Sequence, residues 1–169
     1  NYGHGFWEDM SVYNSVIRGS RFNDNSGTGL FIEISARAVV GDCMFARNGE
    51  FGIKVNNASN VQIWNNTFHG NAGRPVNLVQ DSRRNTNPND QAVDRRIAWP
   101  DPEMPWTLGP VTFRNNVVSG GGGNCVQCVE DYSGQKTAEQ MGVTLDANVY
   151  YRPSTSSPTW LVVWSRGSI

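Results

Sequence analysis

The chain has 169 residues, enough for one domain with a hydrophobic core of its own. Its 14 Lys and Arg residues against 15 Asp and Glu residues give a net charge of −1, which argues against nucleic acid or an anionic membrane bound by bulk electrostatics. No apolar run approaches the length that spans a bilayer. We therefore expect no nucleic-acid partner and no membrane partner.

The opening of the chain bears on its partners. No signal peptide begins the sequence, and Asn1–Gly5 reads as the middle of a repeat and not as a cap. We therefore expect the rest of a longer chain, or further copies in a homo-oligomer, as partners.

Three series of residues recur with a period of about 23 in the first 75 residues. The series are Phe22, Phe45, Phe68; Asn25, Asn48, Asn71; and Gly5, Gly29, Gly52. Each unit opens with a glycine and a short strand, at 5–9, 29–33 and 52–56. A second strand with alternating apolar residues follows, at 16–22, 39–45 and 61–68, and an Asn/Gly turn closes the unit.

Strands this short cannot bury an apolar face alone, whereas stacked coils bury one continuously. The period therefore predicts an all-β solenoid, a right-handed parallel β-helix of five full coils and part of a sixth. We expect the core to hold the apolar columns of the coils, which are Leu30, Ile32, Ile53, Val55, Val76, Phe22, Phe45 and Phe68.

The pattern continues beyond residue 75 with one long insertion. Residues 76–79 predict the next first strand and 111–113 its second strand, and 81–110 is a polar, Pro-rich loop between them. The remaining strands are expected at 126–129, 143–150 and 161–164. All of residues 1–169 then form one β-helix domain.

Recurring Asn and Cys residues have structural explanations. Asn at the turns tolerates left-handed backbone, and stacked amides can form a ladder of hydrogen bonds along the axis. Cys125 and Cys128 are too few, with two histidines in the chain, for a zinc site. We interpret Cys125 and Cys128 as small side chains buried in the core. A disulfide between them is the alternative that stays open.

Alternate side chains of a strand face opposite ways, so the first strands place two columns on the outer face. The columns are Trp7, Phe31, Lys54, Asn77, and Asp9, Glu33, Asn56, Val79. The first begins with two aromatic rings, a usual platform for sugars. The second begins with two carboxylates on neighbouring coils.

Neighbouring strands lie about 4.7–4.9 Å apart, so the carboxyl groups of Asp9 and Glu33 are expected about 5 Å apart, near the separation in retaining glycosidases. Two like charges this close raise one pKa. Outward carboxylates are also common on any solvated sheet face. In the same register Glu8 faces inward, so either the first coil is frayed or its register differs by one.

At Trp7-Glu8-Asp9 and Phe31-Ile32-Glu33 the chain resembles the β-xylosidases built on a β-helix. The resemblance implies that Asp9 is the nucleophile and Glu33 the general acid/base. It covers the first two coils. The chain departs from the family in three ways: Glu8 stands where the family has an apolar residue, Ile34-Ser35-Ala36 follows Glu33 where the family has a polar, His-containing segment, and no part of the chain could form the family's inserted β-sandwich. The whole chain also resembles secreted bacterial β-helix repeat proteins, which implies an extracellular or cell-surface location.

The leading functional hypothesis is a retaining glycoside hydrolase acting on a polysaccharide or oligosaccharide, with no cofactor and no metal. Asp9 and Glu33 are its candidate catalytic residues. The candidate substrate-binding residues are Trp7, Phe31, Lys54, Asn56, Asn77, Trp99 and Trp106. The two loop tryptophans could equally plug the loop onto the flank of the β-helix.

Two alternatives stay open. A polysaccharide lyase or uronate epimerase would use a Lys or Arg base, for which Lys54 is available. A glycan-binding or structural β-helix, such as an adhesin or spike segment, would leave Asp9 and Glu33 as solvated surface residues.

Overall fold

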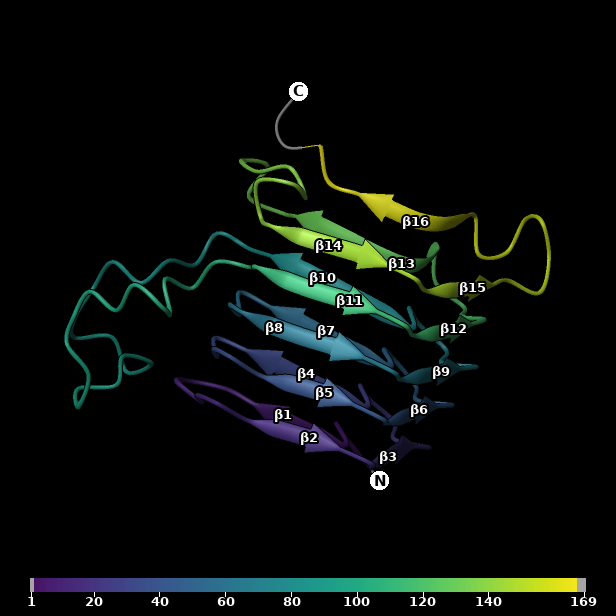
Figure 1. The fold of residues 1–169 in the computed structure, drawn as a ribbon, viewed down its shortest axis with the longest axis horizontal. Helices are drawn as coiled ribbons and strands as arrows, with labels where there is room; N and C mark the ends of the chain where they lie inside the picture. The colour runs from purple at the N-terminus through teal and green to yellow at the C-terminus, as the bar shows by residue number, and fades with distance from the viewer. Residues whose placement is uncertain (1, 167–169) are drawn as a thin grey trace.

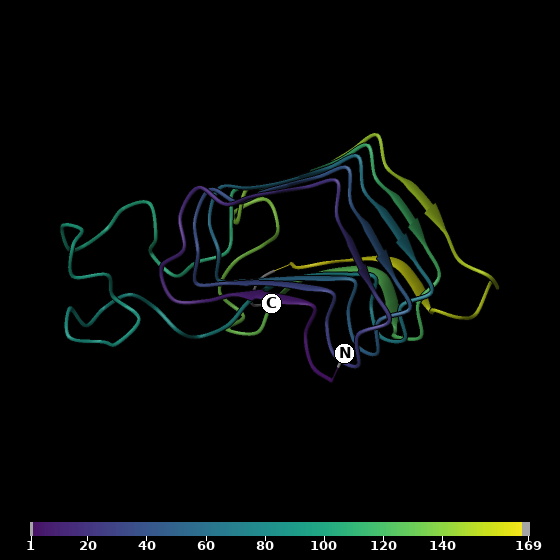
Figure 2. The same ribbon diagram turned by 90° about the horizontal axis from the view of Figure 1, so that it is seen from below.

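The computed structural model, which describes residues 2–166, is a parallel β-helix with three sheets (Figures 1 and 2). The first sheet contains β1 (Phe6–Glu8), β4 (Leu30–Glu33), β7 (Ile53–Asn56), β10 (Val76–Gln80), β13 (Cys125–Asp131) and β16 (Trp160–Trp164). The second contains β2 (Val16–Arg18), β5 (Val39–Gly41), β8 (Val61–Trp64), β11 (Val111–Arg114) and β14 (Val143–Asp146). The third contains β3 (Arg21–Asn23), β6 (Met44–Ala46), β9 (Thr67–His69), β12 (Val117–Ser119) and β15 (Val149–Tyr151).

Each coil contributes one strand to each sheet, and all pairs between these strands are parallel. Strands β1–β15 make five coils, and β16 begins a sixth. The repeat count predicted from the sequence is therefore confirmed.

One expectation about the strands is wrong. The second strand of each unit, expected to be continuous over 16–22, 39–45 and 61–68, is two strands that meet at a corner. The residue at the corner has a positive φ in every full coil, and these residues are Gly19, Asp42, Asn65, Asn115 and Ala147. A single residue with left-handed backbone turns the chain, and apolar residues continue to alternate on both sides of the turn. The polarity pattern therefore does not reveal the corner.

The core lies inside the coils. Of the eight residues expected there, seven are fully buried, and Phe22 is half-buried because it ends its column in the first coil. The rings of Phe22 and Phe45 stack with centroids 5.2 Å apart, and those of Phe45 and Phe68 with centroids 4.8 Å apart.

Two ladders of asparagine amides bind the coils at their corners. In the first, Asn25 Nδ2 donates to Asn48 Oδ1 and Asn48 Nδ2 donates to Asn71 Oδ1, each at 2.8 Å. In the second, Asn66 Nδ2 donates to Asn116 Oδ1 at 3.0 Å, and Asn116 Nδ2 donates to the Oδ1 of the next coil's asparagine at 3.1 Å. The ladders inferred from the spacing are therefore present.

Glycine is required where neighbouring coils approach closely. A Cβ on Gly29 would lie 2.6 Å from the carbonyl oxygen of Gly52, which is backbone of the next coil and cannot move aside. The glycine recurs at the start of each unit because a Cβ there would collide with the backbone of the next coil.

Residues 81–110 connect β10 to β11 and extend away from the coils (Figures 1 and 2). A second apolar cluster, separate from the core, attaches this loop to the flank of the β-helix. It contains Ile34 and Ala36 from the coils and Ala92, Met104 and Trp106 from the loop.

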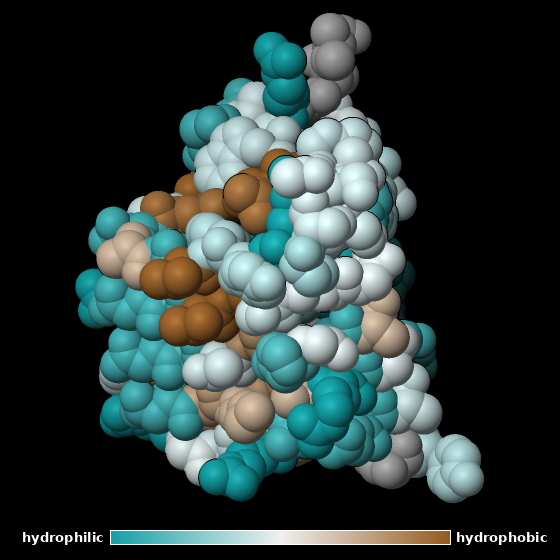
Figure 3. Space-filling model, turned by 90° about the vertical axis from the view of Figure 1, so that its right-hand side faces the viewer, coloured by the Kyte–Doolittle hydropathy of each residue, from teal (hydrophilic) through white to brown (hydrophobic). Residues whose placement is uncertain are grey.

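The third sheet presents a different surface. Apolar side chains gather among polar ones in the upper coils on this side of the molecule (Figure 3). Val117 and Val149, which are paired neighbours on β12 and β15, are both exposed. The polar residues of the candidate site instead lie on the first sheet.

Truncation of the Phe column tests the core. We expect Phe45→Ala to lower the free energy of unfolding by about 3–5 kcal/mol, because the cavity lies between two stacked rings. Phe22→Ala should cost clearly less, because that ring is half-buried and has one stacking neighbour in the column. Urea unfolding of both variants measures the difference, and equal losses would contradict the stack as a buried column.

Candidate functional site

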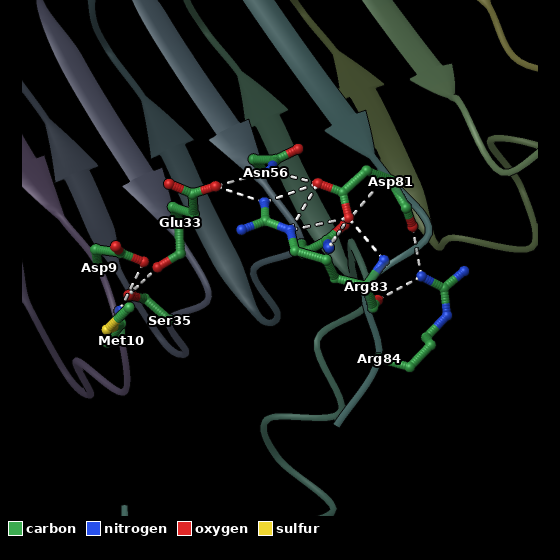
Figure 4. A network of polar contacts seen from close by, with 9 residues as sticks. Asp9, Met10, Glu33, Ser35, Asn56, Asp81, Arg83 and Arg84 are labelled. Atoms are coloured by element: carbon green, nitrogen blue, oxygen red, sulfur yellow. Dashed lines mark hydrogen bonds and ion pairs between the residues drawn. The ribbon is translucent and has the colours of Figure 1, made fainter. Parts of the chain in front are cut away.

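The outer face of the first sheet carries the two predicted columns in the predicted register. Trp7 pairs with Phe31, Phe31 with Lys54, and Lys54 with Asn77. In the other column Glu33 pairs with Asn56. Asp9 follows the last residue of β1 directly, beside Glu33 on the next coil (Figure 4).

The register also settles the position of Glu8. It pairs with Ile32, as the predicted register requires, and its side chain is buried. Ser15 Oγ donates a hydrogen bond of 2.9 Å to Glu8 Oε2, and burial raises the pKa of this carboxyl. Glu8 is therefore an inward acid that a neighbouring hydroxyl satisfies, and the register of the first coil is not shifted.

The aromatic part of the first column is arranged differently from a flat sugar platform. The rings of Trp7 and Phe31 are stacked with centroids 5.5 Å apart and planes within 3°. The Lys54 ammonium lies 4.4 Å from the Phe31 centroid, so both faces of that ring are covered. Phe31 is only 7% exposed, whereas Trp7 is 51% exposed. Of the two rings, Trp7 alone is accessible to a ligand.

Asp9 and Glu33 have unequal surroundings. Burial raises the pKa of Asp9, and the charge of Glu33 raises it further, against smaller opposing effects of the Met10 amide and Arg83. Glu33 is 8% exposed, and its Oε1 accepts hydrogen bonds from Asn56 Nδ2 at 3.1 Å and from Arg83 Nη2 at 2.5 Å. One carboxyl therefore favours its protonated form more than usual, and the other has a cation as its partner.

Arg83 was not among the residues inferred from the sequence, yet it contacts the site directly (Figure 4). It stands in the long loop, three residues after β10. It also forms an ion pair of 2.7 Å with Asp81, whose pKa is held well below its usual range by the Arg83 guanidinium and the amides of Asn56 and Asn57. The signal that could have revealed it is the Asp-Ser-Arg sequence directly after a first strand.

The remaining predicted binding residues have their own contacts. Asn56 and Asn77 are buried, and Asn77 Oδ1 accepts a hydrogen bond of 2.8 Å from Arg74. Lys54 is half-buried, and its pKa is lowered, mainly by burial. In the part of the chain that the structure describes, it forms no ion pair within 4 Å.

The two loop tryptophans behave differently from each other. Trp106 is 5% exposed and packs in the apolar cluster that holds the loop to the coils, as the plug interpretation predicts. Trp99 is 42% exposed, and its Nε1 donates a hydrogen bond of 3.0 Å to Asn85 within the loop. Trp106 is therefore not available to a ligand, whereas Trp99 is.

The cysteines are structural residues. Cys125 and Cys128 are buried and joined by a disulfide, which is the alternative left open by their spacing. Among residues 2–166, no three His, Cys, Asp or Glu side chains are grouped as a metal ion requires. No helix in this range is long and apolar enough to cross a membrane.

Comparison with known proteins supports the fold. Residues 1–92, more than half of the chain, match the family model described as the right-handed β-helix region. The chain belongs to this family. Among curated proteins, none matches the sequence.

This right-handed β-helix is also similar to a solved structure, the A-module of the mannuronan C-5 epimerase AlgE6 from Azotobacter vinelandii. The TM-score is 0.51 at 15% sequence identity, with 96% of this chain and 48% of that chain covered. The β-helix described here therefore spans about half the length of that module. At this identity the similarity concerns the fold.

The buried Glu8 gives this β-helix a testable pH dependence. Its pKa is raised in the folded state, so stability falls as the pH rises from about 4.3, the unfolded value, through the folded pKa. Glu8→Gln keeps an acceptor for Ser15 without the charge. We expect the variant to match the wild type near pH 3 and to be more stable at pH 7, measured by urea unfolding. A constant difference at both pH values would contradict a buried ionisable group.

Proposed function

We propose that this β-helix is carbohydrate-active and hydrolyses a glycoside with retention of configuration. The observation that carries the proposal is the Asp9–Glu33 pair on neighbouring coils, with one carboxyl protonated more readily and the other paired with Arg83. Two carboxyl groups one strand spacing apart suit a retaining double displacement, because the nucleophile and the acid must reach the same glycosidic bond.

The surroundings favour an assignment of roles opposite to the one that the β-xylosidase resemblance implies. A nucleophile must be ionised, and Glu33 has a guanidinium on one oxygen while its Oε2 accepts no hydrogen bond from residues 2–166. A general acid must hold a proton near neutral pH, which a raised pKa favours at Asp9. We therefore assign Glu33 as nucleophile and Asp9 as acid/base.

In this mechanism Glu33 Oε2 attacks the anomeric carbon while Asp9 gives its proton to the departing glycosidic oxygen. The covalent glycosyl–Glu33 ester is then hydrolysed by a water molecule whose proton returns to Asp9. Trp7, the exposed end of the aromatic column, is available to stack on a neighbouring sugar ring.

Azide rescue distinguishes the two assignments. Asp9→Ala and Glu33→Ala are assayed on aryl glycosides, with Asp146→Ala as a control because Asp146 is an exposed carboxylate on the second sheet. We expect each site variant to lose about 10²–10⁴-fold in activity on poor leaving groups. Azide should give a product of inverted configuration from Glu33→Ala and of retained configuration from Asp9→Ala.

The opposite pattern of products would return the nucleophile role to Asp9. Full activity of both variants, at the level of the Asp146→Ala control, would remove the pair from the reaction. Inversion of configuration by the wild type would contradict the retaining mechanism itself.

Lys54 favours a second candidate, a lyase or epimerase acting on a polyuronate. Its ammonium lies on the same face without an ion-pair partner among the described residues, and its pKa is lowered by burial, as a base that abstracts the proton next to a carboxylate requires. The similarity in fold to a mannuronan epimerase makes polymannuronate the first polymer to test.

Incubation with polymannuronate and polygalacturonate tests this candidate. A lyase would give unsaturated ends that absorb in the ultraviolet, and an epimerase would change the uronate signals in the proton NMR spectrum. We expect neither if the hydrolase proposal holds. If either product forms, Lys54→Gln should abolish it, and Lys136→Gln, which changes a lysine outside the two columns, should not.

A further inference from the structure

The long loop contains two copies of one local arrangement, an Asp followed two residues later by an Arg. In each, the Arg amide and Nε donate to one carboxylate oxygen, and Nη2 donates to the other. The first is Asp81 with Arg83, and the second is Asp94 with Arg96. Each Asp thus holds its Arg guanidinium in a fixed, bidentate orientation.

Only the first copy reaches a carboxylate of the coils. Arg83 Nη2 lies 2.5 Å from Glu33 Oε1, across a separation of 50 residues. Arg96 pairs with Asp94 alone within residues 2–166, and its side chain is 88% exposed. The two arrangements have the same local geometry, and only the first contacts the site. A comparison of Arg83 with Arg96 therefore separates the effect of the turn itself from the effect of the contact with Glu33.

The first copy is also fixed to the third coil. The Asp81 amide donates to Asn57 Oδ1 at 2.9 Å, and Asn57 Nδ2 donates to Asp81 Oδ1 at 2.6 Å. Asn56 Nδ2 lies 3.1 Å from both Asp81 Oδ2 and Glu33 Oε1, so it bridges the two carboxylates. Asp81 therefore has all its acceptor positions engaged, and it orients Arg83 instead of taking part in chemistry.

We propose that Arg83 is a positioning residue, which Asp81 aims at Glu33 so that Oε1 is held and Oε2 is left to react. The long loop thereby becomes part of the site. The assignment of Oε2 as the attacking atom rests on the proposed hydrolase function, whereas the clamp on Oε1 does not.

The charges that face Glu33 come from three elements. Asp9 follows β1, Lys54 is on β7, and Arg83 and Asp81 are on the loop after β10. Asp9 repels the Glu33 carboxylate, and Lys54 and Arg83 attract it. Arg83 makes the direct contact, so its removal should change the orientation of the Glu33 carboxylate the most.

Labelling of carboxyl groups with a carbodiimide and glycine ethyl ester, mapped by mass spectrometry, tests the clamp without any substrate, because the reagent must reach the carboxyl group. We expect Arg83→Met to raise labelling of Glu33 severalfold, because Oε1 loses the guanidinium that covers it. Arg83→Lys should give a smaller rise. The matched control Arg96→Met should leave Glu33 unchanged.

Limited proteolysis within residues 81–110 shows in each variant whether the loop remains attached, because Trp106 of the loop is buried against the coils. Unchanged labelling of Glu33 in Arg83→Met with the loop still attached would overturn the proposal. If the wild type hydrolyses a glycoside, kcat should fall in Arg83→Met with KM nearly unchanged, and both constants should match the wild type in Arg96→Met. A labelling change in a protein without hydrolase activity would keep the clamp and reject the proposed function.

Discussion

The parallel backbone ladder between coils is the constraint on which the rest of this structure depends. It fixes neighbouring strands about 4.7–4.9 Å apart and in register, so equivalent residues of successive coils must lie in contact. Each side chain in a column must therefore pack against the side chain at the equivalent position of the next coil. Phenylalanines stack, asparagine amides donate to the next amide, and small residues allow close approach. Two carboxylates do not meet this condition, which is why the Asp9–Glu33 pair stands out.

The way the molecule accommodates that pair explains the position of the loop. A guanidinium between Glu33 and Asp81 offsets like charges that the ladder forces together, and burial shifts Asp9 toward its protonated form. The guanidinium comes from the long loop, outside the regular coils. Apolar packing of Trp106 and the hydrogen bonds of Asp81 attach the loop at two places on either side of Arg83. The insertion after β10 thus serves a local electrostatic need of the first two coils.

The same ladder decides which side chains of the two columns a ligand could reach. In the first column Lys54 covers one face of Phe31 and Trp7 the other, so an aromatic pair that reads as a sugar platform is mostly a stack between coils. In the second column the amide of Asn56 is engaged by two carboxylates. In these two columns, Trp7 is exposed, and the Oε2 of Glu33 accepts no hydrogen bond from residues 2–166.

The sequence by itself determined the coil count, the core columns, the asparagine ladders and the register that brings Asp9 beside Glu33. All of these follow from periodicity, because coils of about 23 residues that stack in register bring equivalent residues together. The tertiary structure alone decided the corner inside each second strand, the burial of Phe31 and Trp106, and the contact of Arg83 with Glu33. A left-handed residue leaves no mark on polarity, and a contact across 50 residues depends on the path of a loop that has no period. The residues that follow the repeat can be placed from the sequence, whereas contacts that break the repeat form between segments that meet only in the folded chain.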